Sequence, residues 1–185
     1  MDSEPLPRPR RGGLNAAKKK AALERRYQRV TCDFPAEFSW GTISHPGRVR
    51  VLGIGGCFLE TQVMVPAGEE IELRFQLDPA LPPVTGQGKI AWISERGISI
   101  TGAGLHRGFA LEFQRIFPED RAAIDEFVRK KTRVFRAVCH ELGKHKPDPG
   151  LIKELFASIC PDESTHLSHI KRVCREELRY FRLRP

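Results

Sequence analysis

The chain has 185 residues, enough for one hydrophobic core with an appendage but too few for two large domains. Hydrophobic residues make up 40% of it and charged residues 29%, which is ordinary for a globular protein, and no apolar run has the length that crosses a bilayer. Five scattered cysteines without a CxxC pair indicate reduced thiols. The start of the chain lacks the apolar stretch of a secretion signal, so we expect a cytoplasmic location.

The net charge of +8 is concentrated at the two ends of the chain. Residues 1–29 contain nine basic and three acidic residues, and residues 171–185 contain six and two. The body between them therefore has a net charge of about −2. Nucleic-acid binding through the basic ends is an alternative function, but few aromatic residues accompany the basic ones, so nucleic acid is not the expected partner.

The first predicted elements follow a low-complexity tail. Residues 1–23 are rich in Pro, Gly, Ala and Lys, which predicts a disordered basic tail. Apolar residues then occupy every second position from Val30 to Trp40, as in a half-buried strand, and Pro35 predicts an edge position or a bulge in it. The motif HPGR at residues 45–48 predicts a turn.

A strand, a glycine turn and a second strand are expected over residues 49–59. Alternation returns at residues 70–77 and predicts another strand, which Asp78 and Pro79 end. Two more short strands are predicted at residues 88–94 and 107–116, with a glycine-rich connection between them. Short strands at regular spacing indicate an antiparallel barrel or sandwich.

Helical periodicity replaces the strand pattern from Pro118 onward. A long helix is predicted up to Leu142, with Gly143 at its carboxyl end. A second helix starts at Asp148 and Pro149, and a third lies within residues 161–181. These helices need an apolar surface, which either the barrel or a second subunit could supply.

Two arginines four residues apart form the first candidate site. Arg25 and Arg29 lie on the same side of the backbone whether the segment is a helix or a strand. Two neighbouring guanidiniums repel each other unless an anion lies between them, and they can hold phosphate oxygens or stack on a purine. The spacing therefore predicts a site for a phosphate-bearing nucleotide, and a solvated basic surface is the alternative.

A known family shares the order of these features. The chain contains RRYQRV, VRVLGIGGCFLET, VPAGEEIELRFQL, GQGKIAWIS and GFALEFQRIFPEDRAAIDEFV in succession. Over residues 24–131 this series resembles the PilZ domain, the bacterial receptor module for cyclic di-GMP. The resemblance implies a fold that is mainly β with α, a six-stranded antiparallel PilZ-like β-barrel followed by a helical C-terminal extension at residues 132–185. It also implies cyclic di-GMP as a ligand and no cofactor.

The first motif of that family is complete in this chain. In PilZ domains an RxxxR motif on the segment that leads into the barrel clasps phosphate and guanine groups of the ligand. Arg25 and Arg29 match this motif, and Arg26 occupies an adjacent position where arginine is common in the family. The resemblance therefore assigns all three arginines to ligand binding.

The second motif of the family, [D/N]xSxxG, is incomplete. When its glycine is placed on Gly56, Val51 replaces the Asp or Asn and Gly53 replaces the Ser, while Gly55 and Gly56 keep the turn. No Asp or Asn occurs near the turn, so a shifted alignment cannot restore the polar pair. We expect apolar or missing ligand contacts at Val51 and Gly53, with binding weakened on the order of 10- to 100-fold.

The sequence thus predicts a cyclic di-GMP receptor and adaptor that passes the signal to a protein partner it cannot identify. The alternative is a degenerate PilZ-like domain that binds no nucleotide and acts only as a protein–protein interaction adaptor. The apolar stripe of the long helix is the predicted surface for a partner or for self-association through the C-terminal helices. Membrane insertion is not expected.

Enzymatic and metal-binding functions have little support in the sequence. No Ser/His/Asp or Cys/His constellation can be assembled, so the chain is predicted not to be an enzyme. His166, His169 and Cys174 suggest a zinc site, but the cysteine falls on the apolar stripe of its helix and no compact ligand pairs accompany it. No metal site is therefore predicted.

Overall fold

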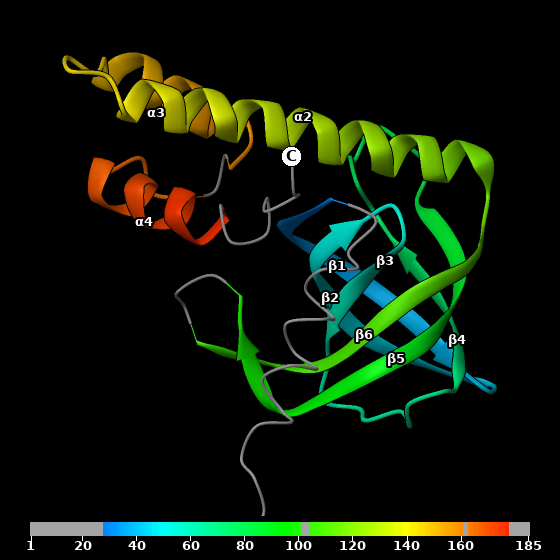
Figure 1. Ribbon diagram of the computed structural model, residues 1–185. Coiled ribbons are helices and arrows are strands. Elements are labelled where there is room, and N and C mark those ends of the chain that lie inside the picture. Colours follow the sequence, from blue (N-terminus) through cyan, green and yellow to red (C-terminus); the bar gives the residue numbers. More distant parts are fainter. Residues whose placement is uncertain (1–27, 101–103, 161–162, 178–185) are drawn as a thin grey trace, which may run out of the picture.

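The computed structural model describes residues 28–100, 104–160 and 163–177. Its strands form a closed antiparallel barrel in the order β1-β2-β3-β6-β5-β4 (Figure 1). The strands are β1 (Arg29–Trp40), β2 (Ile43–Gly53), β3 (Gly56–Glu60), β4 (Glu70–Phe75), β5 (Val84–Ser99) and β6 (Leu105–Ile116). The predicted six-stranded barrel is confirmed, and the predicted tail at residues 1–23 lies outside the described residues.

The alternation that predicted β1 places its apolar side chains inside the barrel. Phe38 is fully buried, whereas Asp33 and Glu37 are exposed. A bulge interrupts the pairing of β1 with β2 between Thr31 and Phe34, directly before Pro35. Pro35 was expected to mark either an edge strand or a bulge. Because β1 pairs with β2 on one side and with β4 on the other, it is not an edge strand, and the structure supports the bulge.

The turn predicted at HPGR is wrong. Residues 45–48 lie inside β2, and the chain reverses instead at Gly41, whose φ of +63° suits glycine. The carbonyl of Pro46 accepts a hydrogen bond from Thr61 Oγ1, which follows β3 on the side of β2 away from β1. The nitrogen of Pro46 points to that side too, so no bond of the β1–β2 ladder is lost.

The connection between β5 and β6 is shorter than the glycine-rich segment that the sequence predicted between the last two strands. Residues 95–99 extend β5, and residues 105–108 belong to β6, so that a long hairpin projects from the barrel (Figure 1). A register shift between Ser94 and Ile98 and the positive φ of Gly97 absorb the extra residues. The glycines that indicated a loop therefore allow irregularities inside a paired ribbon.

Three helices follow the barrel in the described residues. They are α2 (Pro118–Leu142), α3 (Pro149–Ala157) and α4 (Leu167–Glu177). The predicted helices are confirmed, although Gly143 caps α2 with a right-handed φ of −84° rather than the left-handed conformation that favours glycine. None of them is long and apolar enough to cross a membrane, as judged over the described residues.

Helix α2 lies across one end of the barrel and continues beyond it, where α3 and α4 pack against it (Figure 1). Ile124 and Val128 on its first half are buried with the barrel core, and Phe127 contacts the ring of Phe34 at 5.3 Å. The side chain of Asp120 accepts a hydrogen bond from the Thr85 amide at 3.1 Å, which attaches the first turn to β5.

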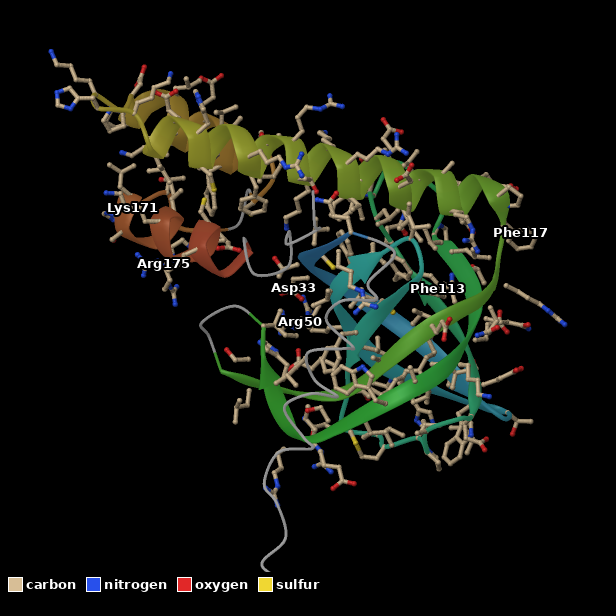
Figure 2. The ribbon with its side chains drawn as sticks, viewed as in Figure 1. Asp33, Arg50, Phe113, Phe117, Lys171 and Arg175 are labelled. Atoms are coloured by element: carbon tan, nitrogen blue, oxygen red, sulfur yellow. The ribbon has the colours of Figure 1, made fainter. Side chains whose placement is uncertain are left out.

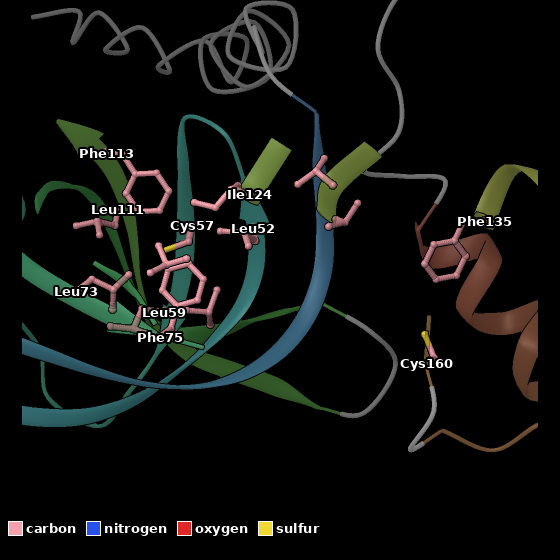
Figure 3. Packing of buried hydrophobic residues seen from close by; sticks show 14 of the residues in the cluster. Leu52, Cys57, Leu59, Leu73, Phe75, Leu111, Phe113, Ile124, Phe135 and Cys160 are labelled. Carbon is pink, nitrogen blue, oxygen red and sulfur yellow. The ribbon is translucent and has the colours of Figure 1, made fainter. Parts of the chain in front are cut away.

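The second half of α2 buries its apolar stripe against α3 and α4, where Phe135, Val138 and Phe156 are fully buried. One connected core thus runs from the barrel into the helices (Figure 3). The chain covers this stripe with its own helices, so its buried residues are not open to a partner. Self-association through the C-terminal helices stays a prediction.

Candidate functional site

Arg29 is the residue of the RxxxR motif that the structure describes. It is the exposed first residue of β1 and pairs with Gly53 at the end of β2. Arg25 and Arg26 lie outside the described residues. The start of β1 thus places one predicted ligand contact directly beside the glycine turn of the second motif.

The glycine turn is shaped by close backbone contacts. A Cβ on Gly53 would lie 2.6 Å from the carbonyl oxygen of Gln28 and 2.9 Å from Cγ of Arg29. A Cβ on Gly56 would lie 2.0 Å from the carbonyl oxygen of Leu111 on β6. A serine at position 53 is therefore incompatible with the present position of Gln28 and Arg29. We call residues 28–31, which include Arg29, the arginine segment.

Gly55 contributes its backbone to the same turn. Its carbonyl accepts a hydrogen bond from the Phe113 amide at 3.0 Å, which fixes the turn against β6. Gly53, Gly55 and Gly56 are thus brought together with Arg29, and each of the three glycines has a packing or hydrogen-bonding role in the folded chain.

Val51 belongs to a second apolar cluster on the outer side of the barrel, separate from the main core. It is 5% exposed and packs with Phe58, Ala110 and Ile100, with Ile98 at the margin. Strand pairing aligns Val51 with Phe58, and Phe58 with Ala110. Ile98 and Ile100 belong to the end of β5 and its hairpin, so this hairpin covers the position where the family has Asp or Asn.

A network of charged side chains lies beside this cluster. Asp33 accepts from Arg48 Nε at 2.6 Å and from Arg50 Nη1 at 2.7 Å, and Arg50 Nε donates to Glu60 at 2.5 Å (Figure 2). Glu60 also contacts His106 Nδ1 at 3.0 Å. The network thus joins four strands, β1, β2, β3 and β6, across the outside of the barrel.

The network changes the titration of its members. Partial burial tends to raise the pKa of Glu60, but the hydrogen bonds from Arg50 and His106 outweigh it and hold this pKa below the usual range. The hydrogen bond to Asp33 raises the pKa of Arg48. The local sequence did not predict this cluster, because alternating charges mark an outer strand face but do not give the register that brings Glu60 to Arg50.

Two hydrogen bonds connect the start of β1 with α2. Gln28 Nε2 donates to Thr132 Oγ1 at 2.5 Å, and Lys131 Nζ donates to the carbonyl oxygen of Thr31 at 2.6 Å. Both contacts lie within three residues of Arg29 in the sequence.

The predicted division between the barrel and the extension after residue 131 falls inside the continuous helix α2, and it stays a prediction.

No disulfide joins the cysteines of the described ranges. Burial raises the pKa of Cys57 to about 12, so this thiol is not nucleophilic at neutral pH. A hydrogen bond with Cys174 lowers the pKa of Cys139, which places these two side chains in contact between α4 and α2. His169 of the zinc hypothesis contacts Glu163 at 2.7 Å, and no group of three metal-ligating side chains is found in the described ranges.

Comparison with known proteins identifies the family. The sequence model of the PilZ domain matches residues 23–130, and the chain therefore belongs to the PilZ domain family. PilZ domains are receptor and adaptor modules rather than enzymes, which supports a non-enzymatic role. No curated protein sequence matches the chain significantly.

Solved structures show the same fold. The chain is similar to the Bacillus subtilis inhibitor of motility MotI/DgrA, with 14% identity and a TM-score of 0.51 over 59% of this chain and 51% of that one. It is also similar to Escherichia coli YcgR in complex with c-di-GMP, with 14% identity and a TM-score of 0.52 over 64% of this chain and 50% of that one. The alignments therefore span about half the length of these two proteins.

Proposed function

We propose that the protein is a cyclic di-GMP receptor that acts as a signalling adaptor. The observation that carries the proposal is the exposed Arg29 at the start of β1, beside the glycine turn, in a chain of the PilZ family. Arg25 and Arg26 precede it on the same segment. Three guanidiniums would hold the phosphates and stack on the guanines of the ligand.

The ligand would be held mainly by these charge-assisted contacts. Val51 is covered by Ile100, and Gly53 is covered by Gln28, so neither position supplies the polar contacts of the family's second motif. Because bonds to ionised groups are about twice as strong as neutral ones, the arginines could retain measurable affinity without this pair. The affinity would then depend strongly on salt concentration.

A nucleotide-independent adaptor is the second candidate, and the buried Val51 favours it. In this alternative the hairpin of β5 and β6 has permanently replaced the ligand on the outer side of the barrel, and Arg29 is surface charge. Under either proposal, we take residues 24–131 as the PilZ-like domain and residues 132–185 as the output extension. We place the protein in the cytoplasm, where a nucleotide second messenger is accessible.

Titration calorimetry with cyclic di-GMP tests the proposal. We expect micromolar or tighter binding by the full chain, and loss of this binding in the Arg25→Ala/Arg29→Ala double variant. GTP controls for general nucleotide affinity. Arg133→Ala on the exposed side of α2 is the matched control for a lost arginine, and it should bind like the unmodified protein. No heat at high ligand concentration would contradict the receptor function and favour the adaptor.

A further inference from the structure

Lys131 is a buried lysine on the side of α2 that faces β1. Lys131 is only 6% exposed, and its ammonium donates a hydrogen bond to the carbonyl oxygen of Thr31 at 2.6 Å. No ion pair of Lys131 with a carboxylate is found in the described part of the chain. Lysine is rarely buried without a charged partner, because leaving water is costly for an ammonium group.

The position does not need a lysine for packing. The buried side of α2 is largely apolar around it, with Ile124, Val128 and Phe135, and it also holds Thr132 and Glu141. A methionine would fill a similar volume without the cost of burying a charge. The feature that only the ammonium supplies is the hydrogen bond to the backbone of β1, two residues after Arg29.

A continuous series of contacts leads from Lys131 into the helical extension. Its Nζ lies 5.6 Å from the ring centroid of Phe135, and the ring of Phe135 meets that of Phe156 edge-on at 6.3 Å. Phe156 of α3 in turn contacts the ring of His169 on α4 at 6.2 Å, again nearly perpendicular. The carbonyl of Thr31 is thus connected with α4 through packed side chains.

A second contact fixes the same part of β1 from the other side of Arg29. Gln28 donates to Thr132 Oγ1, and Thr132 in turn donates to the carbonyl of Val128 within α2. The two hydrogen bonds enclose Arg29 between Gln28 and Thr31. A change in the order of the arginine segment must therefore stretch or tighten contacts with α2.

We propose that Lys131 is a positioning residue that couples the arginine segment to the helical extension, so that ordering of one stabilises the other. The physical link is the Lys131–Thr31 hydrogen bond and the aromatic contacts behind it. The inference rests on the proposed function for the identity of the ligand that orders the segment. The coupling itself does not, because it is a property of the free protein and acts equally in both directions.

Hydrogen exchange of the unliganded full chain, measured by mass spectrometry, tests the coupling. Phe156→Leu loosens α3 against α2, and we expect it to accelerate exchange at residues 28–33 by about fivefold or more. In the Lys131→Met background the same substitution should have no further effect at residues 28–33. Lys130→Met, an exposed lysine on the same helix, is the matched control and should preserve the effect of Phe156→Leu.

A double-variant cycle separates coupling from a general loss of stability. Additive effects of Phe156→Leu and Lys131→Met on exchange at residues 28–33 would overturn the proposal, as would an unchanged exchange rate in Phe156→Leu. If Lys131→Met does not fold, Lys131→Leu takes its place in the cycle, since it also removes the ammonium that donates to Thr31. Loss of the Phe156→Leu effect in that background supports the coupling, and its persistence contradicts it.

A second set of measurements with cyclic di-GMP separates this inference from the proposed function. If the ligand binds, it should slow exchange in α4 of the unmodified protein, and this protection should be lost in Lys131→Met at ligand concentrations that saturate the variant. Binding without any protection of α4 would overturn the coupling and leave the receptor function intact. If the ligand does not bind, the receptor function fails, and the cycle in the unliganded chain decides the coupling alone.

Discussion

At the scale of single residues, the incomplete second motif is explained by packing. Val51 lies under the hairpin that ends β5, and Gly53 lies under the backbone of Gln28. An aspartate at position 51 would be buried among Phe58, Ile100 and Ala110. The residues that depart from the family's motif are thus the ones that fit the present arrangement of the chain.

Restoring the motif's carboxylate should therefore destabilise the fold. We expect Val51→Asp to lower the free energy of unfolding by about 2–4 kcal/mol, because an unpaired carboxylate enters an apolar cluster. Urea unfolding at pH 7 measures the loss. Val51→Thr keeps the shape and is expected to cost about half as much or less. Equal stability of the two variants would mean that the hairpin leaves position 51 open to water.

The ion pairs of Glu60 should make stability depend on acid pH. Its pKa is lower in the folded chain than its usual value of about 4.3, so the carboxylate stabilises the fold above that pH. This contribution is lost as the pH falls through the lowered folded-state pKa. Glu60→Gln should therefore be less stable than the unmodified protein at pH 7, and the difference should shrink at about pH 3.

Urea unfolding of both proteins at the two pH values measures this difference. Glu37→Gln is the matched control, because Glu37 is an exposed glutamate of the same barrel outside the network. It should show a small difference at both pH values. A loss of stability in Glu60→Gln that is independent of pH would contradict an ionic origin.

At the scale of elements, caps and bulges determine where strands and helices begin and end. Asp148 caps α3 by accepting from the amides of Gly150 and Leu151 at 2.8 and 3.2 Å. The sequence predicted this helix start correctly, because an aspartate before a proline at the first helical position is a strong local signal. Local side-chain chemistry is sufficient for such boundaries.

Removal of this cap should weaken the helical extension. We expect Asp148→Ala to lower the free energy of unfolding by about 1 kcal/mol, because two amides at the start of α3 lose their acceptor. Asp148→Asn retains an acceptor oxygen and should stay within a few tenths of a kcal/mol of the original. Urea unfolding followed by circular dichroism at 222 nm distinguishes them. Equal losses in both variants would show that the charge, rather than the cap, matters.

At the scale of the whole molecule, the barrel and the helices share one core. Ile124 and Val128 of α2 are buried with the barrel, and Phe135 and Val138 of the same helix are buried with α3 and α4. A single continuous helix therefore contributes to both parts. Neither part can lose α2 without exposing apolar surface to water.

The shared core predicts a single cooperative unfolding transition. The two tryptophans, Trp40 and Trp92, lie in strands, so their fluorescence reports the barrel, whereas circular dichroism at 222 nm reports mainly the helices. We expect both signals to give the same urea midpoint. Phe156→Ala should shift both midpoints downward together, through a cavity cost of about 3–5 kcal/mol. A lower midpoint for the helices alone would show that the extension unfolds independently.

The elements that the sequence predicted correctly are those that depend on residues close together in the chain. The alternation over Val30–Trp40 and the helical spacing after Pro118 identified the strand and the long helix, because the spacing of apolar residues within each segment shows which face is buried. The turn at residues 45–48 was predicted wrongly, because a proline can remain in a strand where its nitrogen points away from the neighbouring ladder. That orientation depends on pairing between distant segments.

The candidate site shows the same division. Residue type and spacing alone identify the basic segment with Arg25, Arg26 and Arg29, the glycine turn and the absence of the polar pair. The cover of the hairpin over Val51 and the hydrogen bond from Lys131 to the backbone of β1 are visible only in the folded chain. These contacts join residues far apart in the chain, and strand register and helix placement, which no local pattern specifies, bring them together.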